Sequence, residues 1–186
     1  GPFDIMGFQE CEDVNRVLGD AGILGQYSTL PGSHALCVAY RSSNWESLSS
    51  GTDDVAEDRP EQYYGRRAVQ WGRLRHRATG KVVFFLNHHG GLPVNTGGVC
   101  GGEATAYNIL KLVSQQSQAG DAKIVLGDLN NDANSAMQAT IGGRMERVID
   151  GWVDAIFTSC VGSMVSVKNL GNGGSDHNAL EAVFRV

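Results

Sequence analysis

The sequence predicts an α+β protein in which mixed β-sheets pack together and helices lie outside them. Three observations lead to this class. Many short segments alternate between apolar and polar residues or are rich in β-branched residues, and fewer segments have helical spacing. The order of these segments fits neither strict β-α-β alternation nor an all-β protein. With 186 residues, of which 41% are hydrophobic and 19% charged, the chain is expected to form a single domain over residues 1–186.

The individual elements follow from local patterns. Strands are expected over residues 4–8, 35–40, 68–75, 81–87, 122–126, 152–158, 160–167 and 179–186. Helices are expected over residues 12–21 and 103–118. The polar stretch 42–60 predicts a surface excursion and the glycine-rich stretch 90–102 a loop. We expect the strand over 160–167 to pair with the strand before it.

The charge and the cysteines restrict the kinds of site. The net charge of -5 means that a polyanionic substrate must be held locally, by a metal ion and a few arginines. No two cysteines form a C-x-x-C pair, which argues against a structural zinc site. Two disulfides are possible, but the balance favours free and mostly buried thiols, with Cys100 the exposed one.

The hydropathy and the first residues of the chain lead to two further expectations. No apolar run approaches the length of a membrane span. The chain opens with Gly1-Pro2, the pair that a common tag-cleaving protease leaves behind, so its natural start and any signal peptide are expected upstream of what the sequence shows. The compartment is therefore left open.

Residues that can carry chemistry gather after predicted strands in four places. These are Gln9-Glu10, Asn87-His88-His89, Gly127-Asp128-Leu129-Asn130 and Ser175-Asp176-His177. Neighbouring strand residues point to opposite faces, so only one of the two adjacent histidines can enter a cleft. Asp128 and Asn130 are two residues apart and share a face. Each place alone is also typical of a turn or a capped helix end.

The order of the four places resembles the endonuclease/exonuclease/phosphatase superfamily, the deoxyribonuclease I-like proteins. Residues 65–71 are similar to its arginine-bearing strand, and residues 152–157 to its strand with a D-x-I pattern. The resemblance runs from residue 3 to residue 186 and implies a four-layer α/β sandwich of two mixed sheets with helices outside. Most members begin with one more strand, which ends in an asparagine, and this chain has no counterpart. One sheet is therefore expected to lack its usual first strand.

The resemblance implies a metal site and a water-activating group. Glu10 would bind the catalytic Mg²⁺ or Mn²⁺, and Asp176 would also be directed at the metal. Asp128 would orient or activate the attacking water, and Asn130 would donate a hydrogen bond to the scissile phosphate.

The resemblance also implies the proton-transfer and phosphate-binding groups. His177 would contact the phosphate or take a proton, and Asp154 would hold its imidazole in one tautomer. His89 would assist the leaving oxygen. Arg66 or Arg67 would clamp the phosphate, because a guanidinium fork matches two phosphoryl oxygens.

Three functions are compatible with these residues. The leading hypothesis is a metal-dependent hydrolase that cleaves DNA or RNA phosphodiesters. The second is a phosphatase or phospholipase acting on phosphoinositides, sphingomyelin or a small phosphoester. The third is a non-catalytic binding protein on the same fold. Basic or aromatic residues along the groove would favour nucleic acid, and an exposed apolar loop would favour lipid; no such loop is evident, which favours a nuclease.

Overall fold

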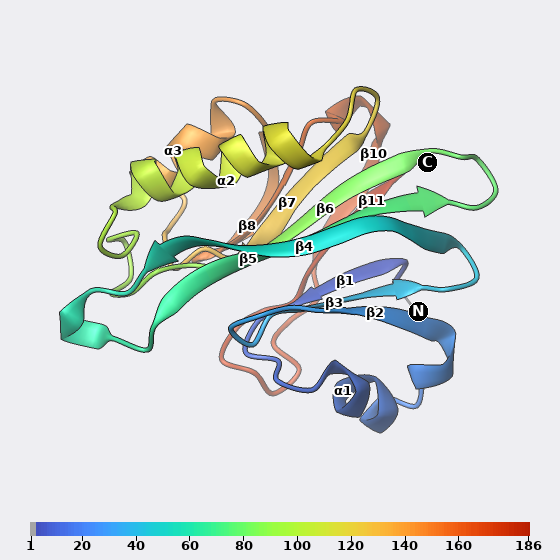
Figure 1. Cartoon of the computed structure of the whole chain (residues 1–186), viewed down its shortest axis with the longest axis horizontal. Coiled ribbons are helices and arrows are strands. Elements are labelled where there is room, and N and C mark those ends of the chain that lie inside the picture. Colours follow the sequence, from blue (N-terminus) through green and yellow to red (C-terminus); the bar gives the residue numbers. More distant parts are fainter. Residues whose placement is uncertain (1–2) are drawn as a thin grey trace.

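Four layers of secondary structure stack in the computed structural model, which describes residues 3–186 (Figure 1). Gly1 and Pro2, the expected protease remnant, lie outside these residues. Helices α2 (Gly102–Gln116) and α3 (Ala136–Gly142) cover one face of a six-stranded sheet. Two smaller sheets cover its other face, and helix α1 (Val14–Asp20) lies outermost on that side. The expected α+β class with outer helices is confirmed.

The six-stranded sheet has the order β4-β5-β6-β7-β9-β8. Its strands are β4 (Trp45–Glu57), β5 (Arg66–His76), β6 (Val82–His89), β7 (Ala122–Asp128), β8 (Glu146–Gly151) and β9 (Asp154–Thr158). All neighbours are antiparallel except β6 and β7, which are parallel because α2 lies in the connection between them. The carboxyl ends of β6 and β7 therefore meet at one edge of the sheet, where His89 pairs with Asp128.

The second layer is split into two antiparallel sheets. One has the order β1-β3-β2, from β1 (Ile5–Phe8), β2 (Tyr27–Pro31) and β3 (Cys37–Arg41). The other pairs β10 (Met164–Asn169) with β11 (Leu180–Phe184). β1 contacts β6 and β7, whereas β11 contacts β8 and β9. The second layer therefore consists of two smaller antiparallel sheets instead of the one mixed sheet that was expected.

Two hydrophobic cores flank the large sheet because its side chains alternate between faces. In β6, Phe84 and Leu86 pack in a cluster with helices α2 and α3. Val83 and Phe85, on the opposite face, pack with residues of β2 and β3. The polar residues that end these strands continue the same alternation, so the face that meets the second layer carries the side chains of interest.

Two expectations about the strands were wrong. Residues 42–60 do not form a surface excursion, because β4 is a thirteen-residue strand on the edge of the large sheet, paired along its length with β5. Most of its middle is exposed, so its polar composition looks like a loop. The strand over 160–167 does not pair with its predecessor, because β9 is already flanked by β7 and β8 and β10 pairs with β11.

Short elements complete the chain. Helix α1 is capped by Asp13, whose side chain accepts a hydrogen bond from the Arg16 N–H. Single 3-10 turns span Leu24–Gln26, Pro60–Gln62 and Val161–Ser163. The sequence did not predict β2, α3 or β8. Among residues 3–186, no helix has both the length and the apolar composition needed to cross a bilayer.

Candidate active site

Three neighbouring strands of the large sheet bring ionisable side chains to one edge. His89 ends β6, Asp128 ends β7 and Asp154 begins β9. The register pairs His89 with Asp128 and Asp128 with Asp154. Adjacent strands lie about 4.8 Å apart, so this register alone places the three side chains within reach of one another. His177 joins them from the loop before β11.

Distances show that these residues form one cluster. The His177 Nδ1–H donates to Asp154 Oδ2 over 2.9 Å, and His177 Nε2 lies 3.9 Å from Asp128 Oδ2. His89 Nε2 lies 3.4 Å from the same Asp128 oxygen. Asp128 thus lies between two imidazoles, and the His177 imidazole is fixed by a hydrogen bond from its other nitrogen.

The surroundings adjust the ionisation of the cluster. Burial alone would raise the pKa of Asp128, but the hydrogen bonds from His89 and the Asn130 N–H, with the charge of His177, hold the pKa below its ordinary value. Burial would lower the pKa of His177, but the hydrogen bond that it donates to Asp154 and the nearby carboxylate charges raise it instead. Burial, with the charge of Asp128, raises the pKa of Asp154. An ionised carboxylate therefore faces an imidazole that favours its protonated form.

Asn130 is held by the backbone of the β7 end. Its N–H donates to Asp128 Oδ1 over 2.8 Å, and its side-chain Nδ2 donates to the Gly90 carbonyl over 3.0 Å. Its φ of 49° lies in the left-handed region, which asparagine tolerates better than most residues. The backbone N–H of Asn130 thus orients the Asp128 carboxylate, and its side-chain amide is held at the end of β7 by the Gly90 carbonyl.

Of the two predicted arginines, one reaches the cluster. Arg67 donates a forked pair of hydrogen bonds to Asp58 over 2.8 and 2.9 Å, and its Nη1 lies 3.3 Å from His89 Nδ1. The same Nη1 lies 3.5 Å from His89 Nε2, so the guanidinium approaches both ring nitrogens and adds positive charge beside His89. Arg66 is exposed and pairs with Asp54 over 3.2 Å.

Comparison with known proteins identifies the fold. No family model matches the chain, and no curated protein matches its sequence. Solved structures do match. An endonuclease/exonuclease/phosphatase from Bacteroides vulgatus superposes with a TM-score of 0.74 at 21% identity, over 97% of this chain and 84% of that one. The chain has the endonuclease/exonuclease/phosphatase fold.

Other proteins of the endonuclease/exonuclease/phosphatase fold have different substrates. A mannosyl-6-phosphatase from Bacteroides thetaiotaomicron matches with a TM-score of 0.69 at 20% identity, over 98% of this chain and 86% of that one. D. rerio TDP2, solved in complex with a single-strand DNA product, matches with a TM-score of 0.70 at 15% identity, over 98% and 86% of the two chains. At these identities the likeness establishes the fold.

The donor chemistry of the cluster fits the divalent cation expected for this fold. Asp128, Asp154 and His177 each offer one ligand atom, and these atoms lie within 4.8 Å of one another. Carboxylate oxygens suit Mg²⁺ and Mn²⁺, and imidazole is compatible with Mn²⁺. His177 Nδ1 is already bonded to Asp154, which leaves the carboxylate oxygens as the better donors.

The two predicted metal ligands lie outside this cluster. Glu10 follows the end of β1, is exposed and has a φ of 53°. Within residues 3–186 its carboxylate accepts no hydrogen bond. Asp176 is also exposed, accepts a hydrogen bond from Ser175 Oγ over 3.4 Å, and contributes to raising the pKa of His177. In the part of the chain that the structure describes, neither carboxylate forms a salt bridge, and their role as ligands remains a prediction.

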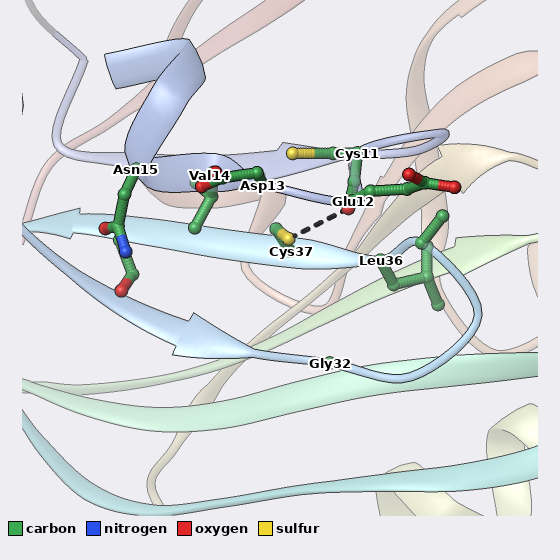
Figure 2. A pocket seen from close by; sticks show the side chains of 10 residues that line it. Cys11, Glu12, Asp13, Val14, Asn15, Gly32, Leu36 and Cys37 are labelled. Carbon is green, nitrogen blue, oxygen red and sulfur yellow. Dashed lines mark hydrogen bonds between the residues drawn. The ribbon is translucent and has the colours of Figure 1, made fainter. Parts of the chain in front are cut away.

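A hollow of about 460 Å³ lies beside the segment that follows Glu10, and its lining includes none of the predicted site residues. Figure 2 shows the Cys37 sulfur directed at the Cys11 carbonyl, to which it donates over 3.1 Å. Burial is the main reason that the pKa of Cys11 is raised to about 12. The cysteines are free, and Cys100 is exposed, as expected. Its low thiolate content makes Cys11 unsuited to nucleophilic catalysis.

Two residues of the site had no predicted role, although Asn87 belongs to one of the four predicted places. Asp58 is fully buried and holds Arg67, yet it lies in the stretch that looked like a loop. Asn87, also buried, donates to the Phe8 carbonyl over 2.8 Å and accepts a hydrogen bond from the Gln9 side chain. It therefore ties the end of β1 to β6, immediately before Glu10. A polar residue at an inward position of an apolar strand was the available signal for Asn87.

Proposed function

We propose that the chain is a divalent-metal-dependent hydrolase of phosphoester bonds, and that its substrate is a nucleic acid. The observation that carries the proposal is the convergence of His89, Asp128, Asp154 and His177, from distant parts of the sequence, on one edge of the large sheet. Two carboxylates and two imidazoles at this spacing can move protons and hold positive charge against a phosphate.

Each residue has a role that its surroundings favour. Asp128, ionised at neutral pH, accepts a proton from the attacking water. His177, held by Asp154 and with a raised pKa, presents its Nε2–H to a phosphoryl oxygen. His89, which lies beside Asp128, is placed to assist the leaving oxygen. A bound Mg²⁺ or Mn²⁺, with Glu10 and Asp176 as proposed ligands, would supply further positive charge to the phosphate.

Nucleic acid is the favoured substrate, and a small phosphoester is the alternative. D. rerio TDP2, whose fold this chain shares, was solved with a single-strand DNA product. The mannosyl-6-phosphatase of the same fold supports the alternative, in which the chain hydrolyses a phosphomonoester. A non-catalytic binding role is disfavoured, because every predicted proton-transfer position is filled by the required residue type and the side chains meet.

A substrate panel tests the activity. Plasmid DNA, RNA, bis-p-nitrophenyl phosphate, mannose 6-phosphate, an inositol phosphate and sphingomyelin are each incubated with Mg²⁺, Mn²⁺, Ca²⁺ or EDTA. We expect cleavage of a nucleic acid with Mg²⁺ or Mn²⁺ and none in EDTA. Preferential release of phosphate from a monoester would support the alternative, and inactivity on every substrate would support the binding protein.

Two substitutions test the site itself. Asp128→Ala and His177→Ala are each expected to lower the rate by about two to three powers of ten, because each removes a group that acts on the transition state. Asp20→Asn and His76→Asn, which lie away from the cluster, are the matched controls. Circular dichroism checks that all four variants are folded. Wild-type rates in either site variant would show that the assignment is wrong.

A further inference from the structure

An exposed tryptophan borders the site. Trp152 is 63% exposed, whereas the other two tryptophans, Trp45 and Trp71, are 2% and 7% exposed. The indole centroid of Trp152 lies 5.8 Å from the His177 ring centroid, with 34° between the two planes. Part of the indole therefore rests beside an imidazole of the cluster, while most of its surface is open to solvent.

The backbone at this position does not favour a tryptophan. Gly151 pairs with Asp154 across the end of β8 and β9, so Trp152 and Val153 form a two-residue hairpin turn. Trp152 has a φ of 70°, at the first central position of the turn, where glycine is preferred. A bulky side chain in the left-handed region is a strained choice. Since the indole is not in the core, neither the turn nor the packing accounts for it.

The charges around the site leave little to attract a long phosphate backbone. Arg66 pairs with Asp54 and Arg67 with Asp58, so both arginines predicted to bind phosphate are already paired with carboxylates. The chain as a whole has a net charge of -5. Binding of a nucleic acid here must therefore depend on contacts to a few groups near the cleaved bond. A flat apolar ring beside His177 offers such a contact.

We propose that Trp152 is a stacking platform for the nucleobase next to the cleaved phosphate, which makes single-stranded nucleic acid the substrate class. This inference rests on the proposed function. Aromatic side chains stack on any base, because every base has a π-face. In a duplex those faces are covered by neighbouring bases, and in a single strand they are free. The turn holds the indole beside His177, the residue proposed to contact the phosphate.

Binding without turnover tests this inference. A fluorescein-labelled phosphorothioate hexathymidylate, whose backbone resists hydrolysis, is titrated with protein in Mg²⁺ and followed by anisotropy. An abasic phosphorothioate hexamer has the same charge and no bases. We expect wild type to bind the thymidylate at least about 10-fold more tightly than the abasic strand, since stacking on one aromatic side chain is worth that much.

Variants separate stacking from a structural role. Trp152→Ala is expected to weaken thymidylate binding by about 10-fold and to leave abasic binding unchanged, and Trp152→Phe to retain most of the affinity. Tyr107→Ala, which removes an exposed aromatic residue on helix α2, is the matched control and should bind as wild type does. Trp152→Gly is expected to unfold at no lower temperature than wild type, because glycine relieves the turn.

The inference is overturned by any of three results. Trp152→Ala could bind thymidylate as tightly as wild type does. Trp152→Ala could weaken the binding of the abasic strand and of the thymidylate equally, which would give Trp152 a structural role in the site. Wild type could fail to prefer thymidylate over the abasic strand. Absence of hydrolysis in the substrate panel would instead reject the proposed function, and the two failures are seen by different measurements.

Discussion

His88 and His89 are neighbours in β6 and have opposite surroundings, because successive strand residues face opposite sides of the sheet. His89 lies in the cluster with Asp128. His88 is fully buried on the other face, where its Nδ1 lies 2.8 Å from the Ala68 carbonyl and its Nε2 has no partner among the described residues. Since a carbonyl only accepts, the proton of His88 is on Nδ1, and the ring is neutral.

His88 should make the fold sensitive to acid. Burial lowers its pKa from 6.5 to about 4, so the folded chain excludes a proton that the unfolded chain accepts. This contribution to stability is complete above pH 6.5 and is lost as the pH falls toward 4, at up to about 1.4 kcal/mol per pH unit. Urea unfolding between pH 7.5 and 4.5 measures it. His88→Leu should make the free energy of unfolding depend less steeply on pH. His76→Asn is the control and should keep the wild-type slope. A wild-type slope in His88→Leu would contradict a role for His88.

Asp154 should control the protonation of His177. Its hydrogen bond and charge raise the pKa of His177, so Asp154→Asn is expected to move that pKa to a lower value. NMR titration of the imidazole Cε1–H in EDTA follows His177 directly. Asp176→Asn is a matched control, because Asp176 is the smaller contributor, and should give a smaller shift. Equal shifts in the two variants would mean that the hydrogen bond to Asp154 is not the main cause.

At the scale of elements, the ends of β6 and β7 approach each other closely at Gly127. Its φ of 145° is one that side chains rarely adopt, and an added Cβ would lie 1.9 Å from the His88 carbonyl oxygen. No rotation of a side chain can relieve a contact with backbone. Gly127 therefore permits the register that sets Asp128 beside His89, one residue further along both strands.

Replacement of Gly127 should separate these strand ends. Gly127→Ala is expected to lower the free energy of unfolding by about 2–3 kcal/mol or more, from strain in φ and the displaced backbone. Gly142→Ala is the matched control, because nothing lies within 4 Å of its added Cβ and alanine favours a helix. It should be neutral or stabilising by up to about 1 kcal/mol. Urea denaturation compares the variants, and wild-type stability in Gly127→Ala would refute the argument.

For the molecule as a whole, local patterns predicted most strands, two of the helices and the residues that meet at the sheet edge. His89 and Asp128 were recognisable because each ends an apolar strand, whereas Asp154 was identified only through the resemblance to the superfamily. β4 was missed because an edge strand with exposed polar residues resembles a loop. The role of Trp152 was missed because it depends on a turn conformation and on a residue far along the chain. The exposure of Glu10 and Asp176, and the split of the second layer, depend on tertiary packing that spacing alone does not encode.

Metal binding should be visible in the stability of the whole chain. A cation held by the folded state alone stabilises it by about 2.7 kcal/mol at 100 times its Kd. For a chain of this size that raises Tm by roughly 5–10 °C. Thermal unfolding in Mn²⁺, Mg²⁺ or EDTA at matched ionic strength measures the effect. Glu10→Gln, which weakens a proposed ligand, should reduce the shift, and Asp20→Asn should keep it; an unchanged Tm in wild type with either cation would count against the site.

The residues of the cluster lie on β6, β7, β9 and the loop before β11, and this separation in sequence affects the order in which the chain folds. The parallel pairing of β6 with β7 needs the long crossover through α2, and His177 arrives only with the last part of the chain. Contacts so distant in sequence form late and slowly. During refolding, recovery of activity should therefore lag behind recovery of secondary structure, so that a partly folded chain stays chemically inert until its final strands have docked.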